Sequence, residues 1–179
     1  MIIGLTGTFS AGKDTAAEYL ERQKGFQHIS TGDIIREHAR ARGLPVDRDT
    51  LIRLSNEIRA EKGPGIFGQE ALARVTGNAV VSGLRNVKEV EFLKSSGQPF
   101  LMIAIDAPAE MRWQRAIARR RLTDDVTLEK FRVQEEIEAH NPYGQQIRDV
   151  IALAYVVIQN DGGPKDLYWK IEEALRDRL

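Results

Sequence analysis

A glycine-rich segment, GTFSAGKDT at residues 7–15, carries residue types at a spacing that suits phosphate chemistry. Gly7 and Gly12 allow backbone conformations and a close approach that side chains would block, so successive N–H groups can point at phosphate oxygens. Lys13 supplies a mobile cation for the β- and γ-phosphates of a nucleotide. The spacing therefore predicts a loop that binds ATP, formed by Gly7, Thr8, Ala11, Gly12, Lys13, Asp14 and Thr15.

The residue after Lys13 departs from the pattern G-x-x-x-x-G-K-[ST], in which a hydroxyl meets Mg²⁺, because it is Asp14. Two carboxylates could supply the metal site instead, Asp14 from the loop and Asp33 from the end of the second predicted strand. Both would act mainly through water, since Mg²⁺ gives up its waters reluctantly. The alternative for Asp14 is an acid that favours the first turn of a helix.

The elements that must position this loop follow from an alternation of short apolar runs with longer helical patterns. That alternation predicts parallel strands joined by crossover helices. The five strands are expected at residues 2–6, 26–30, 79–82, 100–106 and 155–158. The clearest helices are expected at residues 14–24, 31–42, 49–62, 109–121, 128–139 and 165–179. The glycine-rich GPGIFG, residues 63–68, breaks the longest gap between strands, in which two or three helices form a subdomain.

The length and composition of the chain restrict the classes of protein to which this pattern can belong. Its 179 residues suit a single domain. Lys plus Arg and Asp plus Glu are both 26, so bulk charge gives no reason to expect a nucleic-acid or membrane partner. The chain has no cysteine and its three histidines lack ligand spacing, which argues against a zinc site. The first apolar run is too short for a secretory signal, so a cytoplasmic protein is expected. The expected partner is a small-molecule nucleotide substrate, and the expected state is a monomer or homodimer.

Three segments resemble those of known families. MIIGLTGTFSAGKDTAAEYL is similar to the start of P-loop kinases that act on nucleotides, and its G-K-D is similar to that of phage-type deoxynucleoside monophosphate kinases. HISTGDIIR, residues 28–36, resembles a segment of the acceptor site in adenylate kinases, which implies that Thr31, Asp33 and Arg36 face the acceptor. VVSGLRNVKEVEFL, residues 80–93, is similar to the G-x-x-R segment of that family, which implies an acceptor site at Gly83 and a phosphate clamp at Arg85.

The C-terminal third resembles a different family. AYVVIQNDGGPKDLYWKIEEAL, residues 154–175, looks like the last strand and helix of dephospho-CoA kinases. In both families the loop between these elements lies near the donor adenine, which implies base contacts from Asn160 and Gly162. The alternative is an ordinary turn from strand to helix.

Arginines at i, i+3 and i+7 share one face of the predicted helix at residues 109–121, namely Arg112, Arg115 and Arg119. Planar guanidiniums bind phosphoryl oxygens through two hydrogen bonds, and the helix follows a strand whose end faces the ligand side of an open sheet. Arg115 and Arg119 are therefore expected at the transferring group. Residues 119–132 look like a short version of the lid in nucleotide kinases. A solvated basic helix face is the alternative.

These observations predict an α/β protein of the P-loop NTPase type, a three-layer αβα domain over residues 1–179. Its five-stranded parallel sheet carries a helical acceptor-binding subdomain at about residues 31–76 and a short lid. The expected reaction is transfer of the γ-phosphoryl group from ATP, with Mg²⁺, to a nucleoside or deoxynucleoside monophosphate. Such an acceptor is already a nucleophile and needs cations such as Arg36 and Arg85 to hold two anions together.

Two alternatives remain open. A dephospho-CoA kinase would phosphorylate a ribose hydroxyl, and Asp33 would then have to accept its proton. Asp33 also fits a helix-capping box with Ser30, which would make its role structural. The second alternative is a P-loop ATPase or nucleotide-sensing module whose partner is a protein or an RNA.

Overall fold

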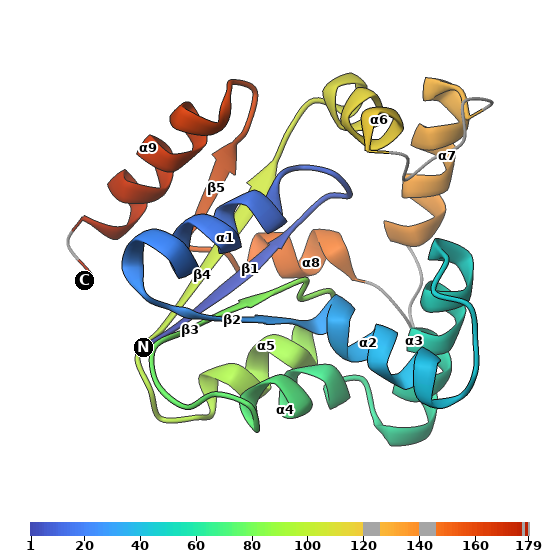
Figure 1. Cartoon of the computed structure of the whole chain (residues 1–179), viewed down its shortest axis with the longest axis horizontal. Coiled ribbons are helices and arrows are strands. Elements are labelled where there is room, and N and C mark those ends of the chain that lie inside the picture. The colour runs from blue at the N-terminus through green and yellow to red at the C-terminus, as the bar shows by residue number, and fades with distance from the viewer. Residues whose placement is uncertain (120–125, 140–145, 177, 179) are drawn as a thin grey trace.

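The sheet has five parallel strands in the order β2-β3-β1-β4-β5 (Figure 1). A computed structural model describes residues 1–119, 126–139, 146–176 and 178. The strands are β1 (Ile2–Gly7), β2 (Gln27–Ser30), β3 (Ala79–Ser82), β4 (Phe100–Asp106) and β5 (Val156–Gln159). Each lies within one residue of its predicted bounds, and the predicted fold class is confirmed. Their unbroken apolar runs arise because helices cover both faces of a parallel sheet.

The helices of the described residues are α1 (Lys13–Lys24), α2 (Thr31–Ala41), α3 (Arg48–Lys62), α4 (Ile66–Leu72), α5 (Val87–Lys94), α6 (Ala109–Ala118), α7 (Leu128–Ala139), α8 (Ile147–Ala152) and α9 (Pro164–Leu175). All six helices singled out in the sequence are present. α9 ends at Leu175 rather than at residue 179, and α6 ends at Ala118 rather than at residue 121. Residues 120–125 of the predicted lid, which was expected at residues 119–132, lie outside the described residues.

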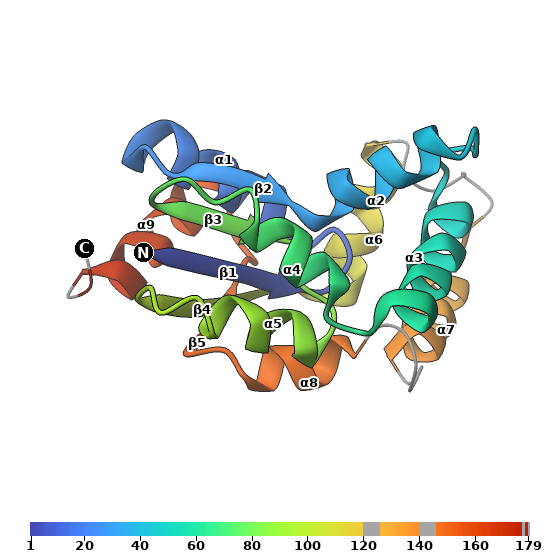
Figure 2. The same ribbon diagram turned by 90° about the horizontal axis from the view of Figure 1, so that it is seen from below.

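Alternate side chains of the central strand enter two different cores. Ile2 packs in one cluster with Val81 and Met102, whereas Ile3 and Leu5 pack in the other. The first cluster is covered by α2, α3, α4, α5 and α8, and the second by α1 and α9. Figures 1 and 2 show the sheet between these layers, with α1 on one side and α5 and α8 on the other. The period of two along a strand thus produces the three-layer arrangement.

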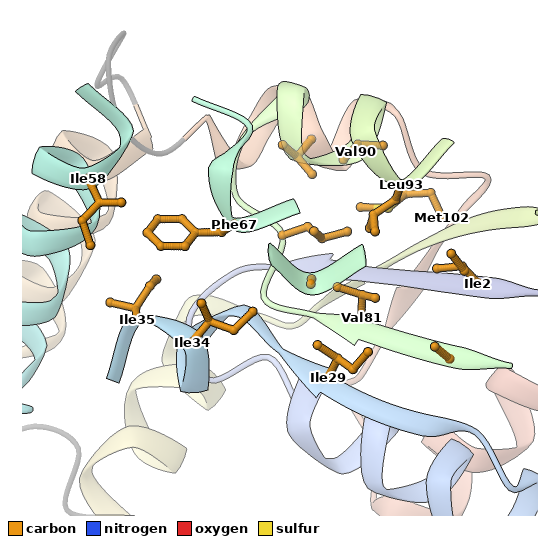
Figure 3. Close-up of a cluster of buried hydrophobic side chains, with 14 of the residues drawn as sticks. Ile2, Ile29, Ile34, Ile35, Ile58, Phe67, Val81, Val90, Leu93 and Met102 are labelled. Carbon is orange, nitrogen blue, oxygen red and sulfur yellow. The ribbon is translucent and has the colours of Figure 1, made fainter. Parts of the chain in front are cut away.

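The insert between β2 and β3 is joined to the sheet by the first core. Phe67 of α4 and Ile58 of α3 are fully buried in the same cluster as Ile29 of β2 and Val81 of β3 (Figure 3). The helices α2, α3, α6 and α7 lie beyond the carboxyl ends of the strands (Figure 2). Ligands of open parallel sheets bind at that edge, so these helices surround the expected site. Within the described ranges, no helix combines the length and apolar character that crossing a membrane requires.

Candidate functional site

The glycine-rich loop turns sharply between β1 and α1. Gly7, Ser10 and Gly12 all have positive φ, at 137°, 59° and 111°. A Cβ atom at Gly7 would lie 1.8 Å from the carbonyl oxygen of Ile105, and one at Gly12 would lie 2.3 Å from Nδ2 of Asn160. Both glycines are therefore required by conformation and by space.

Ser10 and Lys13 are polar residues of the loop that line the adjoining cleft. Nζ of Lys13 donates to the carbonyl oxygens of Gly7 and Thr8, at 3.0 and 2.6 Å. Ser10 lines the adjoining cleft, and its buried hydroxyl has no hydrogen-bond partner among the described residues. A buried hydroxyl without a partner is costly, and an oxygen-rich ligand would satisfy it.

Two neighbouring strand ends brace the loop. Thr8 Oγ1 donates to Oδ1 of Asp106 at 2.6 Å, at the end of β4. Asn160, after β5, donates from Nδ2 to the carbonyl oxygen of Ala11 at 2.7 Å, and its N–H donates to the carbonyl oxygen of Asp106 at 2.7 Å. The sequence analysis missed Asp106. An acid at the end of a strand next to the loop-bearing strand was the available signal.

Arg115 braces the loop between β5 and α9. Its Nη2 donates to the carbonyl oxygens of Asn160 at 3.0 Å and Gly162 at 3.4 Å. Nη1 is buried with no partner in the described part of the chain. Burial, and then the nearby charge of Arg119, lower the pKa of Arg115. The base contacts of Asn160 and Gly162, and the phosphoryl contact of Arg115, stay predictions, because the contacts described for these residues are within the protein.

A cleft of about 520 Å³ opens in front of the loop. Its walls come from the loop, the start of α2, the first half of α3, the turn after β3 and the end of α6. It brings together the predicted residues Gly12, Lys13, Asp14, Thr31, Arg36, Gly83, Arg85 and Arg119. The predicted residues outside its lining are Gly7, Thr8, Ala11, Thr15, Asp33, Arg115, Asn160 and Gly162.

One wall of the cleft is fastened to the sheet by Thr31. Its buried hydroxyl donates to the carbonyl oxygen of Gly83 at 2.8 Å and to that of Ser82 at 3.2 Å. Gly83 has a φ of 84°, and a Cβ atom there would lie 2.7 Å from Oγ1 of Thr31. In this structure Thr31 thus holds the start of α2 against the end of β3.

The carboxylate of Asp33 is engaged by Arg36. Oδ1 of Asp33 accepts from Nε and Nη2 of Arg36, at 3.0 and 2.7 Å. The Asp33 side chain is 61% exposed. Ser30 caps α2, because its Oγ accepts the N–H of Asp33 at 3.2 Å, which is half of the predicted capping box. Arg36 lines the cleft, whereas Asp33 lies outside its lining.

Arg48, at the start of α3, is a cleft residue that the sequence analysis missed. Its guanidinium carbon lies 4.3 Å from the ring centre of Phe9 in the glycine-rich loop, a cation–π contact. Asp47 caps this helix, and hydrogen bonds from Thr50 lower the pKa of its carboxyl group. In the sequence the acids flanking Arg48 indicate only a helix start, so nothing there pointed to the contact with Phe9.

The sheet order and the loop after its central strand define a P-loop kinase-like protein. A family model described as an AAA domain matches residues 6–132. A UPF0200 protein of Pyrococcus abyssi is 33% identical, over 100% of this chain and 97% of that protein. The chain therefore belongs to this AAA-domain family and to the UPF0200 proteins. A UPF0200/UPF0201 protein of Archaeoglobus fulgidus is 30% identical over 97% of this chain, which spans 54% of that protein, about half its length.

Solved structures share the fold. A shikimate kinase from Acinetobacter baumannii in complex with shikimate superposes with a TM-score of 0.62 at 22% identity, covering 99% of this chain and 94% of that one. The shikimate kinase from Aquifex aeolicus gives a TM-score of 0.58 at 22% identity, covering 98% and 96%. At this identity the likeness concerns the fold alone.

Proposed function

We propose that this protein transfers the γ-phosphoryl group of ATP to a nucleoside or deoxynucleoside monophosphate. The observation that carries the proposal is the cleft that joins Lys13 of the loop to Arg36, Arg85 and Arg119. Two polyanions must be brought together in this reaction, and cations on opposing walls lower their repulsion. The protein would act in the cytoplasm, as a monomer or homodimer, on small molecules.

The donor side of the cleft suits a triphosphate. The loop N–H groups, the ammonium of Lys13 and the hydroxyl of Ser10 would bind its phosphate oxygens. Asp14 lines the cleft in the first turn of α1 and would hold Mg²⁺ through water. Mg²⁺, when bound, offsets the negative charge on the phosphates. Of the two carboxylates predicted for the metal, Asp14 is better supported, because it lines the cleft and Asp33 lies outside the lining.

The acceptor side suits a phosphate nucleophile. An ionised monophosphate needs no base, and Arg36 and Arg85 would hold its oxygens in line with the donor. The position of Asp33 favours this acceptor, because its carboxylate is bound by Arg36 and lies outside the cleft lining, where it is poorly placed to take a proton from a hydroxyl.

A hydroxyl acceptor is the second candidate. The named fold neighbours are shikimate kinases, and the C-terminal third resembles dephospho-CoA kinases. A hydroxyl must lose a proton during transfer. The base would have to be Asp14 or Asp47, the carboxylates that the described residues contribute to the cleft lining, or the predicted Asp33, which lies outside that lining.

An acceptor screen tests the proposal. Purified protein with Mg-ATP is offered each ribo- and deoxynucleoside monophosphate, dephospho-CoA and shikimate, and ADP and the phosphorylated product are followed. A product from a monophosphate, absent with Lys13→Ala, would support the proposal. A product from dephospho-CoA or shikimate alone would replace it with the hydroxyl acceptor. ATP hydrolysis that no acceptor stimulates would favour an ATPase or sensing module.

A further inference from the structure

A buried ion pair joins α3 to α5 behind the cleft. Arg59 donates from Nη2 and Nε to Oε1 of Glu89, at 2.8 and 3.1 Å. The side chains are 1% and 0% exposed. Removing two charges from water costs free energy that their attraction often fails to repay, and an apolar pair of similar volume is often as stable. Stabilisation alone is therefore a weak explanation for this pair.

The second oxygen of Glu89 holds the backbone of the predicted phosphate clamp. Oε2 accepts the N–H of Arg85 at 2.8 Å and the N–H of Asn86 at 3.2 Å. These residues form the turn from β3 into α5, and the Arg85 side chain lines the cleft. One carboxylate thus fixes the main chain from which Arg85 projects.

Arg59 connects this carboxylate to the part of the cleft wall that α3 forms. Its Nη1 donates to Oγ of Ser55 at 3.3 Å, one turn earlier on α3. Ser55, Leu51 and Ile52 of the same helix line the cleft. The path from the α3 wall through Arg59 and Glu89 to Arg85 consists entirely of direct contacts.

The GPGIFG segment makes this connection possible. A Cβ atom at Gly68 would lie 2.5 Å from the carbonyl oxygen of Glu89 and 2.6 Å from its Cα atom. Glycine therefore lets α4 approach the backbone of α5. The adjacent Phe67 lies 4.9 Å from the Arg59 guanidinium carbon, measured to its ring centre, and extends toward Ile58 of α3 (Figure 3).

We propose that Arg59 and Glu89 are positioning residues, which fix Arg85 relative to α3 so that the acceptor meets a preset clamp. What Arg85 binds rests on the proposed function, whereas the fixation itself does not. The competing explanation is local: Glu89 also closes a capping box with Asn86 at the start of α5, and the pair would then only stabilise the fold.

Amide hydrogen exchange of the nucleotide-free protein tests the fixation. The N–H groups of Arg85 and Asn86 are expected to exchange as slowly as those of the buried strands, because both donate to a buried carboxylate. Exchange as fast as in an exposed turn would overturn the proposal. No substrate is needed, so this result is independent of the acceptor.

Two double variants separate positioning from stabilisation. In R59M/E89Q the ion pair is gone, but the Gln oxygen can still accept both N–H groups. In R59M/E89M that acceptor is lost as well. With AMP or the best monophosphate of the screen, we expect R59M/E89M to raise the acceptor KM about tenfold, which corresponds to about 1.4 kcal/mol of lost acceptor binding. The KM for ATP should change less than about threefold in both double variants. The acceptor KM of R59M/E89Q should rise by about threefold to tenfold, because the link to α3 is lost while the turn keeps its acceptor.

The matched control is K88M/E91M, which removes an exposed ion pair from the same helix with the same change in charge. It should change neither KM.

A folded R59M/E89M protein with an unchanged acceptor KM, or with equal rises in both KM values, would overturn the positioning role. If R59M/E89M does not fold, Arg59→Lys decides, because it keeps the charge but cannot reach Glu89 and Ser55 together; an unchanged acceptor KM would refute the role. If no monophosphate reacts, the proposed function fails, and exchange at Arg85 and Asn86 in the two double variants decides this inference alone.

Discussion

Asn160→Ala in the nucleotide-free protein distinguishes a brace of the glycine-rich loop from a contact to the donor base. Asn160 is 6% exposed, and its Nδ2 donates to the carbonyl oxygen of Ala11. Removing the donor leaves that carbonyl without the partner, a cost of about 1–3 kcal/mol. Taking about 2 kcal/mol, the melting temperature of a protein of this size should fall by roughly 4–8 °C.

The assay is thermal unfolding followed by circular dichroism, without ATP, and then a titration with ATP. The loosened loop should also bind ATP more weakly, since its N–H groups are no longer held in place. Asp161→Asn is the control on the same turn. Its exposed side chain pairs with Lys170, so its melting temperature should stay within about 1–2 °C of wild type.

An unchanged melting temperature together with weaker ATP binding would refute this reasoning. Asn160 would then act through the nucleotide, as the resemblance to dephospho-CoA kinases implies. The discrimination works because a base contact does not exist before ATP is added, whereas a contact within the protein does.

Three further predictions concern charge and protons. Lys13→Ala should lower turnover by about 100-fold or more while leaving the protein folded, because a preorganised cation is lost; near-normal turnover in the folded variant would contradict the P-loop assignment. Asp33→Asn should lower turnover by less than about 100-fold, and Arg85→Ala should chiefly raise the KM of the monophosphate; loss of the basic limb of the pH profile in Asp33→Asn would instead favour a hydroxyl acceptor. The hydrogen bond to Glu172, and then burial, raise the pKa of Tyr19 to about 12, so its stabilising contribution should be lost as pH rises from 10 toward 12. Absorbance titrations of wild type and Tyr19→Phe check this. The number of tyrosines that ionise near pH 10 should be the same in both proteins, and a smaller number in Tyr19→Phe would contradict the raised pKa of Tyr19.

The strands were predictable because their environment leaves a direct signal. A strand covered on both faces has no polar alternation, and the runs at β1 and β4 are apolar nearly throughout. The helices α4 and α8 gave no such signal, since seven and six residues are too few to show a helical period. The eight-residue α5 begins with a capping box at Asn86, which is the sign that could have located it.

The site was predictable where function depends on the backbone. Gly7 and Gly12 are required by the course of the loop, and their spacing, with Lys13 directly after Gly12, is readable in the sequence. The contacts of the arginines of α6 were not predictable, because residues on a shared helix face can extend their long side chains to different places. Arg112 donates to Ala107 and pairs with Glu135, Arg115 reaches the turn after β5, and Arg119 reaches the cleft.

The loop could be recognised from its local spacing, whereas the residues that hold it in place, Asp106 and Asn160, could not, because they are distant from it in sequence. Thr8 and Asp106 are 98 residues apart, and Ala11 and Asn160 are 149 residues apart. At Gly12 the two kinds of constraint coincide: the φ of 111° is a local requirement, while the 2.3 Å approach of Asn160 is imposed by β5. Removing the Asn160 side chain would relieve only the second, because the left-handed conformation would remain unfavourable for any other residue. The conformation of the loop is therefore enough to require glycine at position 12. The hydrogen bond from Asn160 to Ala11 stabilises that conformation further.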